Sequence, residues 1–408
     1  METKEIEFDE YILERILDIG SRMLIAGGEI HRVDDTISRL CFAYGALYAD
    51  VFTITSSIVV TVRFKDREPM TQTRRIGAQN IDLANLAQLN DLSRQICKKP
   101  KTCEEISESL NRITPAKNHP VLNFLVWALI SANYTIFFGG SKWDAISAAI
   151  IGILLLQFKN FLDKYFLNYY LVIILCSMMG GILSVIPLIF QLSDSPFYIN
   201  IGNIMLLIPG ITLTTAIRDM FSGDTISGLL RFVEAIIVSM MIAWGFAVFD
   251  LANIVPTYSQ PPIIQLATAF IGSVGFTYMF NNRTFTGFLG SIGGLIGWVI
   301  VMLAQSGGLS EYLAYAFAAI FVTLYAENMA YINRCPTTLF LTVGTIPLIP
   351  GKSLYVTMQY AVGQEWSKFI SQGITTLLYA VAISAGIILV TACWDSIRMQ
   401  QKKIKHKG

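Results

Sequence analysis

Charged residues are scarce in this sequence. Asp, Glu, Lys and Arg make up 14% of its 408 residues, and apolar residues make up 53%. Soluble proteins carry about 25% charged residues, so this composition excludes a disordered chain and argues against a single soluble globule. The mean hydropathy of +0.54 indicates a membrane protein instead. The net charge of +1 leaves no basic excess, so we expect no nucleic acid as a partner.

Residues that bind metals or form disulfides are scarce too. The sequence contains three histidines, which are too scattered to suggest a histidine metal site: His31, His119 and His406. Cys41, Cys97 and Cys103 show no C-x-x-C spacing, so we expect free thiols in a reducing compartment. We expect no bound metal and no cofactor, although a metal site built from carboxylates alone is left open.

The few charges are distributed unevenly along the chain. Of the 59 charged residues, 34 lie in residues 1–118 and 25 lie in the other 290 positions. Residues 1–118, here called the head, therefore have the composition of a soluble domain, and residues 119–408, the membrane body, do not. The head contains charges from its start and no early apolar run, so we expect no cleaved signal peptide and a cytoplasmic location.

Hydrophobic periodicity predicts an α+β head. We expect helices at 8–26, 29–43, 81–97 and 102–113, and strands within 50–64 and at 70–75. Thr102 followed by Glu105 fits a capping box at the start of the last helix.

The membrane body contains ten apolar stretches of about 20 residues, the length at which a helix spans a bilayer. They lie near 121–138, 144–161, 166–191, 200–218, 226–249, 262–280, 284–304, 310–328, 336–358 and 369–392. We therefore expect a polytopic α-helical membrane protein with five spans in residues 119–250 and five in residues 251–408, where a basic cytoplasmic tail follows. With a cytoplasmic head, eleven basic residues would lie inside and only Lys142 and Lys368 outside. This asymmetry predicts cytoplasmic termini.

The membrane body also repeats itself. A shift of 141 residues aligns the segment LLIPGITL (206–213) with PLIPGKSL (347–354), and each segment falls in the fourth span of its half. Because each half has an odd number of spans, the halves must run in opposite directions. This is the inverted repeat of many secondary transporters.

The two Pro-Gly pairs predict broken helices near the middle of the membrane. They are Pro209-Gly210 and Pro350-Gly351. A helix that begins there exposes N–H groups that can bind an anion. Polar residues follow each pair and are substrate-site candidates: Thr212, Thr214 and Thr215 in one copy, and Lys352, Ser353 and Tyr355 in the other. The alternative is two kinked helices whose hydroxyls bond back to their own carbonyls.

Charged side chains within the spans are candidates for coupling and gating. Lys352 could bind a substrate carboxylate, carry the coupling proton, or form a structural ion pair with Glu234, which is itself a proton-carrier candidate. Arg218, Asp219 and Asp224 could form an inner gate or be solvated charges at a helix end, and Asp219 is a further proton carrier candidate. Asn133 is a weaker substrate-site candidate.

The densest polar run of the head is GGEIHRVDD (27–35). Its simple interpretation is a turn followed by the acidic start of a helix. The alternative is a ligand or substrate-coupling site formed by Glu29, His31, Arg32 and Asp35. No nucleophile and base at a recognisable spacing support an enzyme.

The sequence resembles the threonine/serine exporter family. The residues that carry the resemblance are 27–45, 52–57, 208–224 and 349–365. The resemblance implies an inner-membrane exporter of small amino acids that is driven by the proton gradient and made of a soluble domain, five spans and five more. In some relatives the halves are separate chains, a form associated with succinate export. The family's head has been compared to hydrolases.

We therefore expect a secondary transporter, such as a proton antiporter, that exports threonine or serine by alternating access around the two broken helices. Its partners would be the small substrate, protons and the lipid bilayer, and a homo-oligomer is left open. Three alternatives remain: an exporter of small dicarboxylates such as succinate, a membrane-anchored enzyme with a hydrolase-like head, and a channel.

Overall fold

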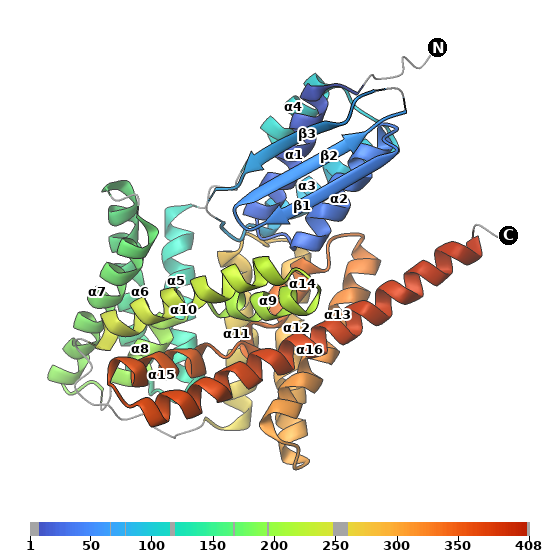
Figure 1. Ribbon diagram of the computed structural model, residues 1–408. Helices are drawn as coiled ribbons and strands as arrows, with labels where there is room; N and C mark the ends of the chain where they lie inside the picture. The colour runs from blue at the N-terminus through green and yellow to red at the C-terminus, as the bar shows by residue number, and fades with distance from the viewer. Residues whose placement is uncertain are drawn as a thin grey trace.

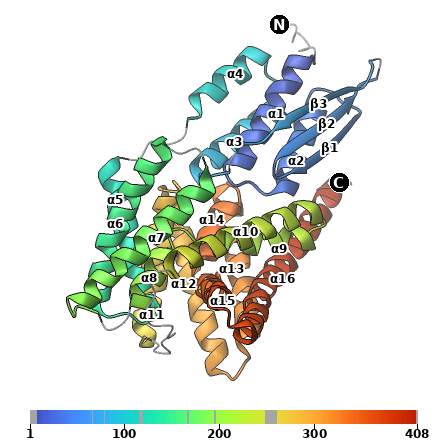
Figure 2. The same ribbon diagram turned by 60° about the vertical axis from the view of Figure 1, so that its left-hand side comes forward.

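The computed structural model describes residues 8–65, 67–77, 79–114, 119–165, 168–193, 196–247 and 260–405. In these residues the chain is largely helical, with one small sheet near the N-terminus (Figure 1). The head, drawn in blue, lies on one end of a bundle of long helices. The C-terminal end of the last helix lies on the same side of this bundle as the head (Figure 2).

The head contains a three-stranded antiparallel sheet in the order β1–β2–β3 and four helices. Its elements are α1 (Glu10–Ile25), α2 (Ile30–Ala43), β1 (Tyr48–Ile54), β2 (Ser57–Arg63), β3 (Met70–Arg75), α3 (Leu83–Lys98) and α4 (Cys103–Arg112). Val60 of β2 pairs with Val51 of β1 and with Gln72 of β3. These bounds lie within two residues of the ranges that periodicity predicts.

Local contacts explain where the helices of the head begin and which face of the sheet is covered. Asp9 starts α1, because its carboxylate accepts a hydrogen bond of 2.8 Å from the Ile12 N–H. Thr102 and Glu105 form the predicted capping box of α4. Alternate residues of β2 are fully buried, so the helices cover one face of the sheet (Figure 1). Gly27 adopts φ +93°, which favours glycine, and turns the chain from α1 to α2.

Eight helices of the membrane body are long and apolar enough to cross a membrane. They are α5 (Pro120–Phe137), α6 (Lys142–Tyr165), α7 (Tyr169–Ile189), α10 (Thr225–Ala247), α11 (Pro262–Met279), α12 (Phe285–Ser306), α13 (Glu311–Asn333) and α16 (Trp366–Lys405). All eight match expected spans. The chain is therefore a polytopic helical membrane protein.

The two other expected spans, 200–218 and 336–358, are not continuous helices. The second consists of α14 (Thr338–Gly344), a 3₁₀ turn η1 (Ile346–Leu348) and α15 (Gly351–Val362), bent by 53°. It is either a ninth, broken span or a re-entrant loop. The first consists of α8 (Pro196–Ile204) and α9 (Gly210–Phe221), separated by residues 205–209. Each piece is shorter than the roughly 20 residues that a span needs. Within the described residues there are thus eight continuous spans and at most nine, and ten spans remain a prediction.

Both breaks occur at the predicted Pro-Gly pairs and have the same local geometry. Pro209 has φ −82° and ψ 45°, and α9 begins at Gly210. Pro350 has φ −77° and ψ 47°, and α15 begins at Gly351. Moving the bounds of α9 by the 141-residue repeat gives the bounds of α15. The aligned segments therefore fold alike.

The two breaks lie against each other in a reciprocal manner. A Cβ added at Gly210 would come within 3.0 Å of Ile349, and one added at Gly351 would lie 3.4 Å from Ile208. The repeat aligns Ile208 with Ile349 and Gly210 with Gly351. The first residue of α9 thus faces the isoleucine before Pro350, and the first residue of α15 faces the isoleucine before Pro209. Such reciprocal contacts are those expected of two segments related by a two-fold axis.

The helices around the breaks follow the same pattern. Helix α9 packs against α10 and α16, and α15 packs against α16 and α10. Helices α5 and α11, which begin the two halves, pack against each other. The broken helix of each half therefore packs against the last long helix of its own half and against that of the other half.

We expect Gly210→Ala to destabilise the protein more than Gly351→Ala. The new methyl group at position 210 would overlap the side chain of Ile349, whereas at position 351 the nearest atom is the Met205 sulfur at 3.2 Å. Overpacking costs about 1–3 kcal/mol, so the melting temperature of the full chain in detergent should fall by about 2–6 °C for the first variant. Both changes add one methyl group to the first turn of a helix, so the second variant is the matched control. Equal melting temperatures would contradict this packing.

Candidate functional site

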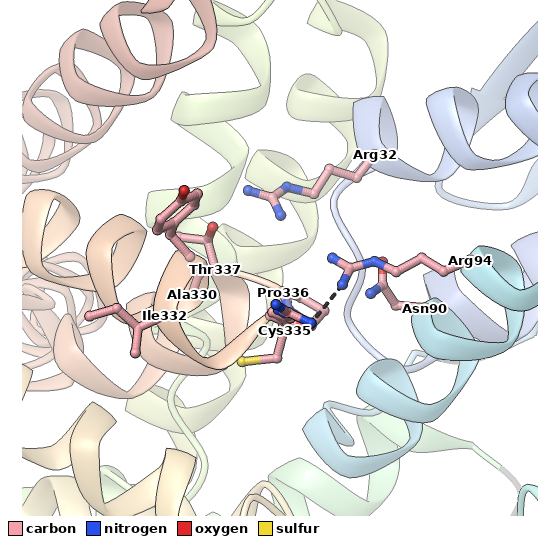
Figure 3. Close-up of a pocket in the computed structure, with 10 residues that line it drawn as sticks. Arg32, Asn90, Arg94, Ala330, Ile332, Cys335, Pro336 and Thr337 are labelled. Carbon is pink, nitrogen blue, oxygen red and sulfur yellow. Dashed lines mark hydrogen bonds between the residues drawn. The ribbon is translucent and has the colours of Figure 1, made fainter. Parts of the chain in front are cut away.

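The head contacts the membrane body at the loops between its helices. The Leu83 N–H donates a hydrogen bond of 2.9 Å to the Phe280 carbonyl in the α11–α12 loop. Arg94 Nη1 donates one of 2.7 Å to the Arg334 carbonyl in the α13–α14 loop. Beside this second contact, a cavity of about 530 Å³ lies between the head and the body (Figure 3).

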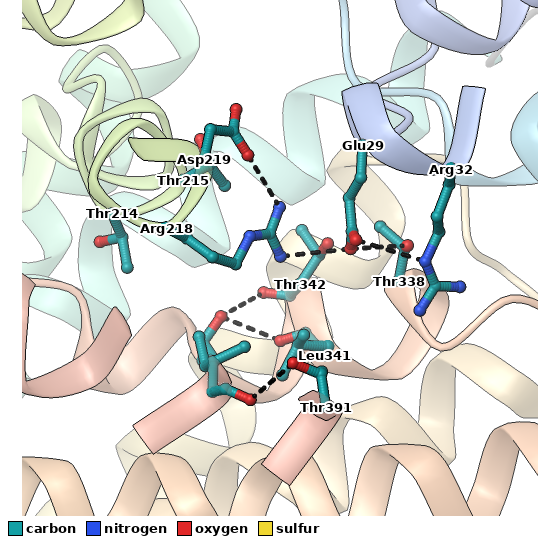
Figure 4. Close-up of polar contacts among 12 residues, drawn as sticks. Glu29, Arg32, Thr214, Thr215, Arg218, Asp219, Thr338, Leu341, Thr342 and Thr391 are labelled. Atoms are coloured by element: carbon teal, nitrogen blue, oxygen red, sulfur yellow. Dashed lines mark hydrogen bonds and ion pairs between the residues drawn. The ribbon is translucent and has the colours of Figure 1, made fainter. Parts of the chain in front are cut away.

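Glu29 extends from the head into the membrane body. Its Oε1 lies 3.2 Å from Arg218 Nη1 at the end of α9 and accepts a hydrogen bond of 3.3 Å from the Thr338 hydroxyl at the start of α14 (Figure 4). Although Glu29 is the N-cap residue of α2, its side chain makes no capping hydrogen bond. One carboxylate thus joins the head to parts of both broken spans. The sequence suggested a helix start here, and the structure shows a long-range contact as well.

The environment of Glu29 favours its charged form. Burial by itself would raise the pKa, but the guanidinium groups of Arg218 and Arg32 and the hydrogen bond from Thr338 outweigh it and lower the pKa to about 2. The contribution of this carboxylate to stability is therefore complete above the unfolded value of 4.5 and is lost as the pH falls towards 2. At neutral pH the contact is fully ionised.

Three further ion pairs extend this contact. Arg231 Nη1 of α10 lies 2.8 Å from Asp219 Oδ2 of α9, and both side chains are almost fully buried. In the head, Arg32 Nε lies 3.3 Å from Glu29 Oε2, and Arg32 Nη2 lies 3.9 Å from Glu327 of α13. We call these residues the Glu29 cluster: Glu29, Arg32, Arg218, Asp219, Arg231, Glu327 and Thr338. Buried charges of this kind are stable only when they are paired.

The other candidates in the head lie apart from the Glu29 cluster. Asp35 is exposed and forms an ion pair of 2.8 Å with Arg39 on its own helix, and His31 is exposed. Asp34, which the sequence did not single out, is half-buried. Burial, together with the charge of Asp224 in the α9–α10 turn, raises the pKa of Asp34 to about 6. No local pattern distinguishes Asp34 from Asp35.

A small cavity of about 30 Å³ lies next to the Glu29 cluster, between α9, α14 and α16. That is about the volume of one water molecule. The hydroxyl groups on its wall bond to their own helices: Thr214 donates to the Gly210 carbonyl (3.1 Å) and Thr345 to the Leu341 carbonyl (2.9 Å). Thr215 likewise bonds to Thr212. These hydroxyls therefore bond back to carbonyls of their own helices, as in the kinked-helix alternative of the sequence analysis. The cavity is also too small for an amino acid.

Lys352 lies on the other side of the breaks. Its Nζ is 5.7 Å from the ring centroids of Phe138, which ends α5, and Phe197 in α8. No ion pair joins it to Glu234, which is exposed on α10. The structural pairing of these two residues, considered from the sequence, is therefore absent. Lys352 lies one residue after the start of α15, where N–H groups and positive charge coincide.

The remaining predicted residues have direct partners. The Ser353 hydroxyl accepts a hydrogen bond of 2.8 Å from Gln372 Nε2 of α16 and lies 2.7 Å from the Thr376 hydroxyl. Tyr355 is buried, with its ring against Phe246. Asn133 donates a hydrogen bond of 2.9 Å to the Thr268 carbonyl and so joins α5 to α11.

Helix α8 carries polar residues that the sequence analysis missed. Asn200 is 1% exposed, and neither atom of its amide group has a hydrogen-bond partner in the part of the chain that is described. Asn203 donates to the Ile199 carbonyl (3.0 Å). A buried amide without partners is costly. The sequence shows two asparagines three residues apart before the first break, but it does not show that Asn200 is buried without a partner among the described residues.

Two family models match consecutive segments of the chain. Residues 14–251 match a family described as "Putative threonine/serine exporter", and residues 265–393 match one described as "Threonine/Serine exporter, ThrE". The chain belongs to the threonine/serine exporter family. The resemblance inferred from the sequence is thereby confirmed. Two of the four segments that carried it, 27–45 and 208–224, contain most of the Glu29 cluster, and another, 349–365, contains Lys352.

Individual members of this and related families are only distantly similar to the chain. The threonine/serine exporter of Corynebacterium glutamicum is 22% identical over 91% of this chain and 80% of its own length. The probable threonine/serine exporter of Mycobacterium tuberculosis is 21% identical over 93% and 77%. A probable succinate transporter subunit of Escherichia coli is 23% identical over 56% of this chain and 90% of its own length. No solved structure matches this member of the exporter family.

We expect Glu29→Gln to loosen the head from the membrane body. The amide removes the charge that pairs with Arg218, and a lost charged hydrogen bond costs about 1.5–3 kcal/mol. Hydrogen exchange of the full chain in detergent should become faster at the end of α9. Glu108→Gln is the matched control, because Glu108 is exposed and forms an ion pair with Arg112 on its own helix. Unchanged exchange in both variants would contradict the role given to Glu29.

Asp34 should make stability depend on pH. Its folded pKa of about 6 lies above the unfolded value of 3.8, so the folded protein binds the proton more tightly. Stability should therefore fall as the pH rises from 3.8 to 6. Asp34→Asn should remove this loss and raise the melting temperature more at pH 7 than at pH 4.5. The exposed Asp35→Asn is the control, and an equal response of both variants at the two pH values would contradict the assignment.

Proposed function

We propose that this protein is a secondary transporter that exports small amino acids, threonine and serine in particular, across the inner membrane. The names of its relatives in Corynebacterium and Mycobacterium support the substrate class. The observation that carries the mechanism is the reciprocal contact of the two Pro-Gly breaks. Membership of a transporter family implies that the chain is not an enzyme.

The proposed architecture is two inverted repeats of five spans each. The exchange of helix contacts between the halves supports it, as does the equal geometry of Pro209 and Pro350. In an inverted repeat the substrate site lies where the discontinuous helices meet. We therefore place the site at the breaks, where α9 and α15 begin.

The proposed orientation places the head and both termini in the cytoplasm. The loops that the head contacts are those for which the distribution of basic residues predicts a cytoplasmic location. They include the α11–α12 and α13–α14 loops. The end of α16 lies on the same side (Figure 2). The Glu29 cluster then closes the cytoplasmic side of the pathway, and Lys352 lies on the outer side of the breaks.

We propose alternating access in which the Glu29 cluster is the inner gate. A closed cytoplasmic side is supported by the cavity beneath Arg218, which has a volume of only about 30 Å³. Opening requires Glu29 to leave Arg218 and Thr338. The carboxylate of an arriving amino acid can take the place of the Glu29 carboxylate on Arg218, so substrate binding and gate opening are coupled. Thr214 and Thr215 lie next along the path.

Beyond the gate, Lys352 and the first N–H groups of α15 would hold the substrate carboxylate before release, beside Ser353 and Tyr355. Asp219 and Glu234 are the two proposed proton carriers. Asp219 is the better placed of them, because it lies inside the gate between Arg218 and Arg231.

A small dicarboxylate is the second candidate substrate. The similarity to a probable succinate transporter subunit favours it, and a cationic Lys352 beside a helix N-terminus suits any carboxylate. An amino acid and a dicarboxylate differ at the second group, which is an ammonium in one and an anion in the other.

Efflux from proteoliposomes tests the function. Vesicles loaded with radiolabelled threonine, serine or succinate should release one or more of them when a pH gradient is imposed, and more slowly without it. Lys352→Ala should reduce this flux at least tenfold, which corresponds to the loss of about 1.4 kcal/mol of substrate or transition-state binding. Lys368→Ala is the matched control, since Lys368 is exposed and pairs with Glu365. Unchanged flux in Lys352→Ala would contradict the site, and no flux of any of the three would contradict the function.

A further inference from the structure

The 530 Å³ cavity between the head and the membrane body lies beside the proposed pathway and shares Arg32 with the Glu29 cluster. Its walls come from α2 and α3 of the head and from residues 330–337 of the body. Figure 3 shows Arg32 and Arg94 reaching from the head towards the α13–α14 loop. A cavity of this volume is within the range of small-molecule sites.

The lining of this cavity is strongly basic. Arg32, Arg94 and Arg334 contribute three guanidinium groups, and no Asp or Glu is among the lining residues. Arg94 is fixed by its hydrogen bond to the Arg334 carbonyl. Neither Arg94 nor Arg334 has a carboxylate within 4.0 Å in the described part of the chain. Arg32 is paired with Glu29 and Glu327. The positive charge that no described carboxylate offsets within 4.0 Å therefore comes from Arg94 and Arg334.

The charge balance selects the chemistry of a ligand. An amino acid substrate fits poorly, because its ammonium group would meet three cations and no carboxylate. A phosphate monoester carries up to two negative charges, and a phosphodiester such as a lipid headgroup carries one. Both present at least two strong acceptor oxygens on a tetrahedral centre, which match the forked donors of arginine.

The cavity also has an apolar side at the membrane surface. Tyr331 and Ile332 line it, and their side chains are 71% and 67% exposed. They lie at the end of the candidate span α13, where aromatic residues are typical of the membrane–water interface. Basic pockets at the cytoplasmic ends of spanning helices are suited to anionic lipid headgroups.

We propose that Arg32, Arg94 and Arg334 form a binding site for a phosphate group at the junction of head and membrane body. The phosphate belongs either to the headgroup of an anionic phospholipid or to a soluble phosphate ester. Arg32 also pairs with Glu29 and Glu327. A phosphate in the cavity therefore competes with these two carboxylates for Arg32 and weakens its ion pairs within the Glu29 cluster. This site does not depend on the transport function proposed above.

Binding is tested on the purified, delipidated full chain in detergent by following its melting temperature. The probes are phosphatidylglycerol, glycerol 3-phosphate, succinate and the electrically neutral lipid phosphatidylcholine. We expect saturable stabilisation by at least one of the two phosphate probes, and at least tenfold weaker apparent binding after Arg94→Gln combined with Arg334→Gln. Arg39→Gln combined with Arg112→Gln is the control, because it removes the same charge from two exposed sites. Stabilisation by phosphatidylglycerol alone identifies the lipid, and stabilisation by glycerol 3-phosphate identifies a soluble ester.

A second measurement uses the chain without substitutions at the arginines. Cys335 lines the cavity, whereas Cys97 and Cys393 are exposed elsewhere. The bound phosphate probe should slow alkylation of Cys335 by a maleimide several-fold and leave the other two thiols unchanged. In the melting-temperature assay, the proposal is overturned if neither phosphate probe stabilises the protein, or if succinate or phosphatidylcholine stabilises it as strongly. It is also overturned if the two double variants bind the phosphate probe equally well. In the alkylation assay, it is overturned if the phosphate probe does not protect Cys335.

Discussion

The arrangement of the membrane body depends on the contact between two interrupted helices, each of which covers the break of the other. A Pro-Gly pair leaves backbone groups without helical partners, and such groups are tolerated at membrane depth only when protein or a water-filled cavity surrounds them. Here each half-helix begins against the chain that precedes the other break, so Gly210 faces Ile349 and Gly351 faces Ile208. Helices α10 and α16 then flank both breaks. Any motion that separates the two half-helices therefore has to break this contact.

Charge explains how the head is attached. The membrane body is poor in charges, and Arg218, Asp219 and Arg231 are gathered where α9 ends and α10 begins. Two arginines share one aspartate, so this group has a net charge of +1, and Glu29 of the head supplies a second carboxylate. Because removing one partner of a buried pair is far more costly than removing an exposed one, the head and the body are held in one arrangement.

Local patterns predicted most of the fold and part of the candidate site. Periodicity located the strands and helices of the head, and hydropathy located the spans, because both depend on neighbours in sequence. Proline and glycine located the breaks for the same reason. The partner of Glu29 was not predictable, since 189 residues separate it from Arg218 and the sequence between them encodes no spacing rule. Asp34 and Asn200 were missed because their special property is burial, which depends on the tertiary structure.

In the structure the Glu29 carboxylate occupies Arg218, which limits what could displace it. Under the proposed function, Glu29 occupies Arg218 with the same chemical group that every amino acid carries. A cargo with a carboxylate offsets the cost of exposing Arg218 when Glu29 withdraws, whereas a cation or an uncharged solute leaves Arg218 unpaired. The lowered pKa of Glu29 keeps the competing carboxylate charged throughout the physiological range. Selection for carboxylates would then occur at the gate itself, before the substrate reaches the two half-helices, and protonation of Glu29 would not be required for opening.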